Sequence, residues 1–112
     1  MKRGEIWTVS GADYAGKPRP AVIVHDNNFS ATYSVTLCPL TTNPADAGLF
    51  RLPVEPSDEN GLQQRSRLMV DKISTVPRGR VGDRIGRLGD AEMTRLSHAI
   101  IVFLGLAGTE SR

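Results

Sequence analysis

Short apolar segments separated by turn residues make up most of the chain. Residues 5–10 (EIWTVS) alternate apolar and polar side chains, as a half-buried strand does, and residues 21–24 (AVIV) form a continuous apolar run rich in β-branched side chains. Further strands are predicted at 34–40, 50–54, 66–70 and 84–88. Pro39 and Pro53 should push the ends of their strands toward sheet edges or bulges. Strands spaced this closely favour a small barrel or sandwich over βαβ units.

One helix is predicted at the C-terminal end of the chain. Asp90 should cap its first free amides, Gly105 and Gly108 should mark its end, and residues 109–112 should fray. Its apolar positions recur at spacings of three and four and should pack on the barrel: Met93, Leu96, Ile100, Phe103, Leu104 and Ala107. The sequence therefore predicts a mainly β fold with a C-terminal helix.

The composition is that of a single globular domain spanning residues 1–112. Hydrophobic residues make up 39% of the chain and charged residues 23%, unlike a disordered chain. No apolar run approaches the roughly 18 residues of a membrane span, and no signal peptide opens the chain, so we expect a cytoplasmic protein with no membrane partner. Cys38 is the only cysteine and no tight histidine cluster is present, so no disulfide, metal or other cofactor is expected.

Charge is distributed unevenly along the chain, although the net charge is only +2. Residues 65–87 hold seven basic residues against Asp71 and Asp83, which gives +5, whereas residues 45–60 hold four acidic residues against Arg51, which gives −3. Such polarisation is typical of a protein with an anionic partner. The alternative is a surface of arginines that only keeps the protein soluble.

Two segments carry candidate phosphate chemistry. In Gly16-Lys17-Pro18-Arg19-Pro20 the prolines fix φ on either side of Arg19, so its guanidinium should be held by a stiff loop, and Lys17 adds a second cation. Thr41, Thr42 and Asn43 follow a strand, where their hydroxyl and amide groups could orient a phosphate. Ordinary turn chemistry is the alternative for both segments.

Other chemistries are excluded by the residues available. The chain has no Walker-type phosphate loop, no HExxH, no Cys/His metal spacing and no GxSxG. A mechanism with two histidines would need both His25 and His98. His98 falls in the helix and is interpreted as structural, whereas His25, which closes the second strand, is a weak acid/base candidate.

The order of these segments resembles the MazF/PemK (Kid) toxin family. The pieces are GEIW, KPRPAVIV, VTLCPLTTN, an acidic loop ending in Asn60-Gly61-Leu62, SRLMVDKISTVPRGRVGDRIGRLGDAEM and a terminal helix, and they span residues 3–107. The resemblance implies a small SH3-like barrel of the CcdB/PemK type. It further implies the toxin of a type II toxin–antitoxin pair, a homodimer that cleaves single-stranded RNA at specific sequences without a metal.

By the same resemblance, Arg19 and Thr41 correspond to the catalytic pair. The RNA substrate itself supplies the nucleophile, its 2′-hydroxyl, so the protein needs to orient that group and stabilise the charge of the phosphorane. The partner implied is an antitoxin whose acidic, partly disordered tail lies in the RNA groove. The predicted RNA-binding residues are Lys17, Arg51, Ser66, Asp71, Lys72 and Arg80.

The chain departs from the family pattern at two places. The Kid branch has an arginine where this chain has Met69, which puts in doubt a mechanism that uses that arginine as the acid. The polar-Asn-Asp sequence after the second strand is His25-Asp26-Asn27 here, which should alter the rim of the groove. Two alternatives stay open: a gyrase poison of the CcdB type on the same barrel, and an RNA-binding barrel without catalysis.

Overall fold

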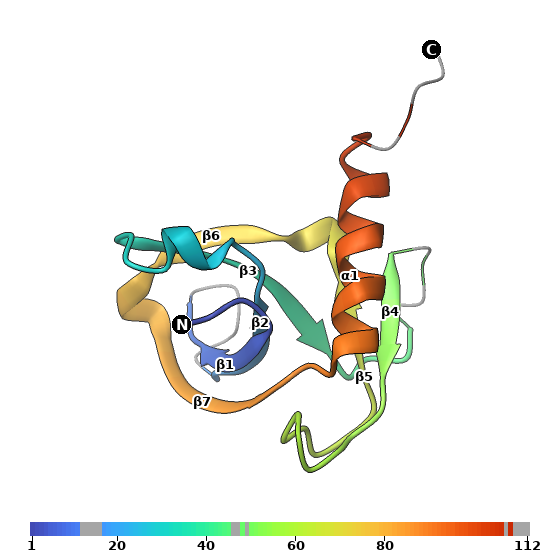
Figure 1. The fold of residues 1–112 in the computed structure, drawn as a ribbon. Coiled ribbons are helices and arrows are strands. Elements are labelled where there is room, and N and C mark those ends of the chain that lie inside the picture. The colour runs from blue at the N-terminus through green and yellow to red at the C-terminus, as the bar shows by residue number, and fades with distance from the viewer. Residues whose placement is uncertain (12–16, 46–47, 49, 107, 109–112) are drawn as a thin grey trace.

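The computed structural model describes residues 1–11, 17–45, 48, 50–106 and 108. Gly16, Asp46, Ala107 and the predicted frayed tail at 109–112 lie outside the described residues. Figure 1 shows curled strands with one helix beside them. The strands are β1 (Glu5–Val9), β2 (Arg19–Ile23), β3 (Ser34–Thr41), β4 (Arg51–Val54), β5 (Ser66–Met69), β6 (Ser74–Pro77) and β7 (Val81–Arg87); the helix is α1 (Asp90–Phe103), and short 3-10 turns form η2 (Asn27–Phe29), η3 (Val70–Lys72) and η4 (Arg78–Arg80).

All six predicted strands are confirmed, and the structure adds β6, which no local pattern of the sequence predicts. β6 pairs with the first half of β3, from Ser34 opposite Pro77 to Leu37 opposite Ser74. Its residues STVP combine two hydroxyl side chains with a proline, so no local apolar pattern marks them. The partner strand therefore determines that this segment is extended.

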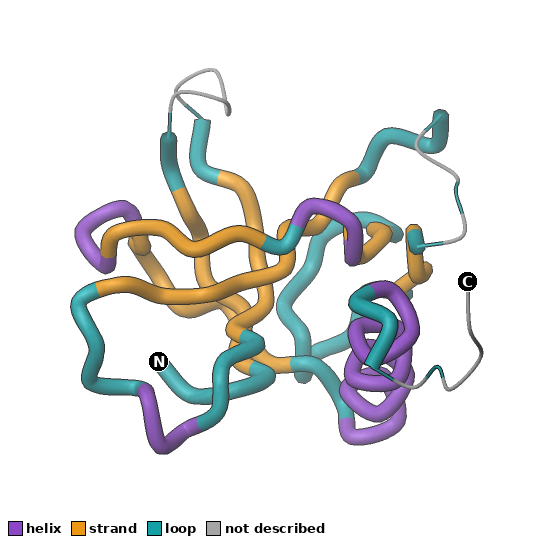
Figure 2. Tube along the Cα trace, turned by 90° about the horizontal axis from the view of Figure 1, so that it is seen from above, coloured by secondary structure: helices purple, strands orange, loops and turns teal. Residues whose placement is uncertain are grey.

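The strands pair antiparallel in the order β4-β5-β3-β2-β1-β7, with β6 on the side of β3. β3 is the central element because its eight residues pair with β2, with β6 through its first half and with β5 through Leu40 and Thr41. Irregular register between β1 and β7, around Trp7, is the kind of bulge that increases local curvature. The strands curl into one body, and α1 lies along one side of it (Figure 2).

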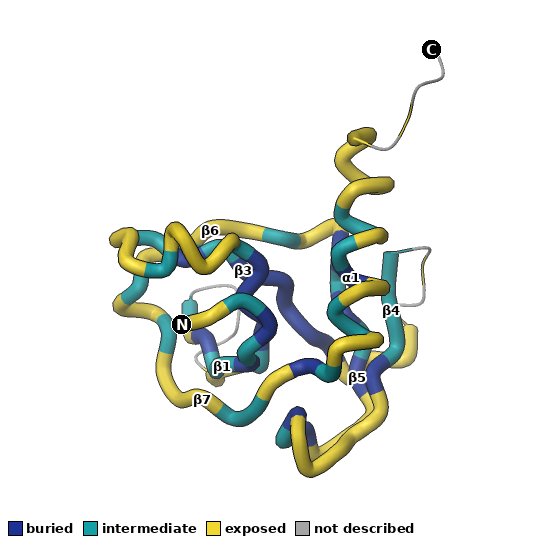
Figure 3. The backbone as a smooth tube through the Cα atoms, viewed as in Figure 1, coloured by how far each residue is buried: buried dark blue, intermediate teal, exposed yellow. Residues whose placement is uncertain are grey.

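The core consists of two clusters on opposite faces of the sheet. Ala21 and Ile23 join the cluster inside the curled strands, whereas Val22 and Val24 join the one that packs toward α1. Successive strand residues point to opposite faces, so a strand covered on both faces needs apolar side chains throughout. This explains the continuous AVIV run, and Figure 3 shows the buried backbone concentrated in these strands.

The helix begins one residue earlier than a cap at Asp90 requires. Asp90 is its first residue and Gly89 precedes it, so the prediction that Asp90 is the cap is wrong; the Glu92 side chain accepts the Gly89 N–H at 3.2 Å. Gly105 ends the helix as predicted, with φ at +76°, while Gly108 lies beyond it. The Leu106 N–H bonds to the Ile101 carbonyl across that turn.

α1 packs on the strands mainly through residues from Met93 to Ile100. Leu96 is fully buried, and Met93 and Ile100 pack on the core. Beyond this point the helix extends past the strands (Figure 3), and the predicted packing of Phe103 and Leu104 on the barrel is only partial. The Phe103 ring packs edge-on against Phe50 with ring centroids 5.0 Å apart but is still 41% exposed, and Leu104 is 59% exposed. The α1 tip is our name for the exposed apolar residues here: Ile101, Val102, Phe103, Leu104 and Leu106. In the described part of the chain, no helix is long and apolar enough to cross a membrane.

Candidate nucleic-acid interface

Arg19 and Thr41 lie at the same end of two neighbouring strands. Arg19 opens β2, opposite Val9 of β1, so it belongs to the strand and not to the preceding loop as predicted. β2 pairs with β3 with Ala21 opposite Pro39 and Ile23 opposite Leu37. The pairing ends at Ala21 and Pro39, and two residues further along the same register Arg19 begins β2 and Thr41 ends β3. The fold thus brings the strand ends that carry these two residues, 22 positions apart in the sequence, to the same edge of the β2–β3 pair.

Thr41 is buried beneath a small cavity lined by arginines. Its side chain is 7% exposed, and its hydroxyl oxygen accepts the Asn43 N–H at 3.1 Å. On the other side of β3, Thr41 pairs with Arg67 of β5. A cavity of about 170 Å³ lies here, lined by Thr41, Thr42, Pro44, Arg65 and Arg67. Arg65 and Arg67 were not singled out from the sequence, although both fall within the basic segment.

Strand alternation determines which predicted residues share a face with Thr41. Residues directly opposite each other in an antiparallel pair point to the same face, and so do residues two apart on one strand. Arg51 pairs with Met69 and Thr41 pairs with Arg67, so these four share a face. Ser66 belongs to the other face and is 3% exposed, with its hydroxyl donating to the Gln64 carbonyl. Its RNA contact stays a prediction, which this burial does not favour.

Arg51 and Asp71 form an ion pair between β4 and η3. The Arg51 side chain is only 12% exposed and its Nε is buried without a partner among the described residues, whereas the Asp71 side chain is 38% exposed. Arg51 lies opposite Met69, so a guanidinium on the neighbouring strand occupies the face where the Kid branch has its arginine. The pair therefore links β4 to the exposed turn that carries Lys72.

Arg80 and Lys17 lie near the same end of β1 as Arg19. Val9 pairs with Arg19 on one side and with Val81 on the other. The carbonyl of Arg80 accepts the Ser10 N–H at 3.0 Å, so η4 is fixed against this end of β1. The side chains of Lys17, Arg19 and Arg80 are exposed. Positive charge thus gathers around the ends of β1, β2 and β3.

Other arginines of the basic segment bind within the protein. Arg78 donates to the Thr32 carbonyl, Arg84 pairs with Glu5 at 3.2 Å, and Arg87 pairs with Glu59 at 3.0 Å. The basic residues of this segment therefore fall into two groups: those that bond to other parts of the protein, and those that are available to a partner.

The histidines lie away from Arg19. His25 follows the opposite end of β2, and its Nδ1 accepts the Thr36 N–H at 3.3 Å. Burial and the nearby positive charges, including Arg78, lower the pKa of His25, so it is mostly neutral near pH 7. A strand's length separates it from Arg19, which argues against His25 as an acid or base there. His98 is exposed on α1, and no described residues form a group of three metal-ligating side chains.

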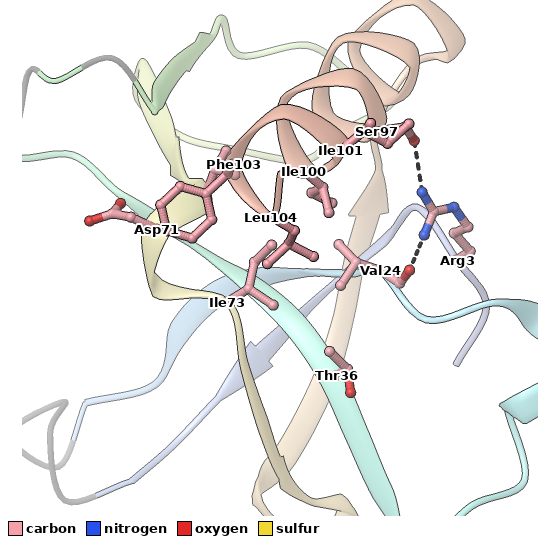
Figure 4. Close-up of a pocket in the computed structure, with 11 residues that line it drawn as sticks. Arg3, Val24, Thr36, Asp71, Ile73, Ser97, Ile100, Ile101, Phe103 and Leu104 are labelled. Carbon is pink, nitrogen blue, oxygen red and sulfur yellow. Dashed lines mark hydrogen bonds between the residues drawn. The ribbon is translucent and has the colours of Figure 1, made fainter. Parts of the chain in front are cut away.

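A second, apolar cavity of about 410 Å³ lies between α1, η3 and the sheet (Figure 4). Arg3 closes one end, where its guanidinium donates to the Ser97 hydroxyl at 2.7 Å and to the Val24 carbonyl, and Asp71 lies at the other. Its apolar lining comes from both the strands and the helix: Val24, Val70, Ile73, Ile100, Ile101, Phe103 and Leu104. The cavity is continuous with the α1 tip, because Ile101, Phe103 and Leu104 belong to both.

Known proteins resemble this chain along nearly its whole length. A Mycolicibacterium smegmatis protein named probable endoribonuclease MazF is 48% identical over 109 residues, covering 96% of this chain and 100% of that protein. Endoribonuclease MazF9 of Mycobacterium tuberculosis is 30% identical over 116 residues, covering 95% of this chain and 98% of its own length.

Solved structures agree with this relationship. A mycobacterial endoribonuclease in complex with its cognate antitoxin superposes with a TM-score of 0.79 at 25% identity, over 95% of this chain and 96% of that one. MazF from Deinococcus radiodurans shares the fold, with a TM-score of 0.73 at 16% identity over 94% and 96% of the two chains. The family model for PemK-like, MazF-like toxins of type II toxin–antitoxin systems matches residues 2–104. The chain belongs to this toxin family.

Proposed function

We propose that this protein is the toxin of a type II toxin–antitoxin pair and a sequence-specific endoribonuclease of single-stranded RNA, with Arg19 and Thr41 as its catalytic pair. The observation that supports the proposal is the antiparallel β2–β3 pair, whose shared end carries Arg19 at the start of β2 and Thr41 at the end of β3, with Thr41 beside a cavity lined by arginines. The names of the relatives favour RNA cleavage over gyrase poisoning and over a barrel without catalysis.

The chemistry requires only the RNA, the protein and solvent water. The 2′-oxygen of the RNA attacks the adjacent phosphorus and passes its proton to water, the bond from phosphorus to the 5′-oxygen breaks, and that oxygen takes a proton from water, which leaves a 2′,3′-cyclic phosphate and a 5′-hydroxyl. Arg19 stabilises the extra negative charge of the phosphorane through its planar fork of N–H donors, and the Thr41 hydroxyl donates to a phosphate oxygen. Orientation of the 2′-oxygen for in-line attack supplies a further part of the rate, without a metal.

Base recognition and affinity come from the residues around this pair. Asp71 and Lys72 combine an acceptor and donors that can read the edges of splayed bases, and the mostly buried Arg51 holds Asp71 in place beside them. Lys17 and Arg80 attract the RNA backbone. In the cytoplasm an acidic antitoxin tail competes for the same groove, because its carboxylates can take the places of phosphates.

A second copy of the chain covers the α1 tip in the working homodimer. Phe103 is 41% exposed and Leu104 59% exposed, beside the apolar cavity. A contiguous apolar patch on a small protein marks an interaction surface. Association also extends the narrow face of one barrel into a groove long enough for several nucleotides.

Primer extension on a long RNA, after incubation with purified protein in EDTA, tests the activity. Wild-type protein should cut at one short sequence. Arg19→Ala should lower the cleavage rate by at least about a hundredfold, the typical cost of losing one such donor. Arg19→Lys should recover little, because an ammonium group cannot reproduce the fork. Arg95→Ala is the matched control, since Arg95 is exposed on α1. If Arg19→Ala keeps more than about a tenth of the wild-type rate, the assigned role of Arg19 is wrong.

A further inference from the structure

The cavity beside Thr41 is lined by two arginines that have no role in the proposed catalytic step. Two of its five lining residues are arginines, and a third, Thr42, offers an exposed hydroxyl. Its volume of about 170 Å³ lies well below the roughly 300 Å³ or more of pockets for drug-sized ligands. The size and the donors fit a small anionic group.

Both arginines keep most of their donors available to a ligand. Among the described residues, the Arg67 guanidinium makes one hydrogen bond, from Nη1 to the Pro44 carbonyl at 3.3 Å. Arg65 pairs through Nε with Glu55 at 2.8 Å, but both of these side chains are more than half exposed. Exposed ion pairs contribute little free energy and can be exchanged for another anion. A guanidinium has five N–H donors, so each arginine can still hold an oxyanion.

The cavity lies next to the proposed position of the scissile phosphate. β2, β3 and β5 are consecutive in the sheet, so Arg19, Thr41 and Arg67 follow one another across three strand ends. Neighbouring strands are about 4.8 Å apart, which puts the outer two strands about 10 Å apart. An RNA strand that crosses these ends with one phosphate on Arg19 and Thr41 carries the next phosphate over the cavity.

We propose that Arg65 and Arg67, with Thr42, form a second phosphate subsite that binds the RNA phosphodiester adjacent to the one that is cut. This proposal rests on the proposed function, because it takes its position from the catalytic pair. The subsite holds the backbone on the β5 side of Thr41 and so fixes the direction in which the RNA crosses the strands.

Neutral backbone substitution tests the subsite. A short oligonucleotide containing the cut sequence is prepared with an uncharged methylphosphonate at each non-scissile position in turn. For wild-type protein, one position adjacent to the cut should raise KM about tenfold or more, as expected for the loss of hydrogen bonds to a charged group. In the Arg65→Gln/Arg67→Gln variant KM should already be raised by a similar factor, and the same methylphosphonate should change it less than twofold.

Controls separate this subsite from general charge and from folding. Arg95→Gln removes one exposed positive charge from α1 and should leave KM and the methylphosphonate pattern unchanged. Circular dichroism checks the fold of the double variant, and Arg65→Gln alone, at an exposed site, provides a variant that does not disturb β5. The salt dependence of binding should weaken by about 0.7 in log–log slope in the double variant, the value for one phosphate contact with a single strand.

The outcomes distinguish the subsite from the proposed function. If the double variant keeps the wild-type KM, or if the methylphosphonate penalty persists in it, the subsite does not exist. If wild-type protein does not cut RNA, the proposed function fails. The subsite is then judged from the dissociation constant of the same oligonucleotides with deoxyribose at the cut position. The subsite is supported if the double variant binds more weakly and has lost the methylphosphonate effect on the dissociation constant at one phosphate only. It is overturned if that effect is reduced equally at every phosphate.

Discussion

Removal of the Asp71 charge should destabilise the fold through the arginine that it leaves behind. Arg51 is 12% exposed and its Nε has no partner among the described residues, so Asp71→Asn leaves a mostly buried guanidinium without its counter-ion. Breaking a fully buried pair costs about 3–5 kcal/mol, and an exposed pair contributes about 0.2–1 kcal/mol. The Asp71 side chain is 38% exposed, between these limits, so we expect a loss of about 1–3 kcal/mol in unfolding free energy.

Urea unfolding of a double-mutant cycle measures this loss. Arg51→Met replaces the buried guanidinium by an apolar side chain and should change the unfolding free energy by less than about 1.5 kcal/mol. In that background Asp71→Asn should cost no more than about 0.5 kcal/mol, as for an ordinary surface substitution. If Asp71→Asn costs the same in both backgrounds, the two residues are not coupled and the argument from burial is wrong. RNA cleavage measured well below both unfolding midpoints then reports any separate role of Asp71 in base recognition.

Three further outcomes follow from the burial or exposure of single side chains. Burial raises the pKa of Cys38 to about 12, so iodoacetamide should modify it only after unfolding, and rapid labelling of the native protein would contradict the core described here. The pKa of His25 is lowered in the folded protein, so the unfolded chain binds this proton more readily and the unfolding free energy should fall as the pH drops through about 6.5. Urea unfolding at several pH values measures this dependence, and His25→Asn should remove the contribution of this residue to it. Leu104→Asp should convert the proposed homodimer to a monomer in analytical ultracentrifugation, whereas Ala91→Asp, exposed at the other end of α1, should not. A Leu104→Asp protein that is still a dimer would show that the interface lies elsewhere.

The elements of this fold could be predicted from the sequence where burial follows a local pattern. The AVIV run predicted a strand, which the structure covers on both faces, and the spacing of Met93, Leu96 and Ile100 predicted α1. β6 could not be found in this way, because its STVP sequence carries no apolar alternation and it is extended only through its pairing with β3. Strand propensity depends on such partners more than helix propensity does.

The site divides in the same way. The sequence by itself determined the chemistry available, with a proline-flanked arginine at 19, a hydroxyl at 41 and a basic segment at 65–87. Only the tertiary structure decided that β3 lies between β2 and β5, which brings Arg67 to one side of Thr41 and Arg19 to the other. It also turned Ser66 inward and left the tip of α1 uncovered. Local patterns encode which side chains avoid water, but register between strands far apart in the chain is set by packing across the whole sheet, and that register determines which functional groups meet.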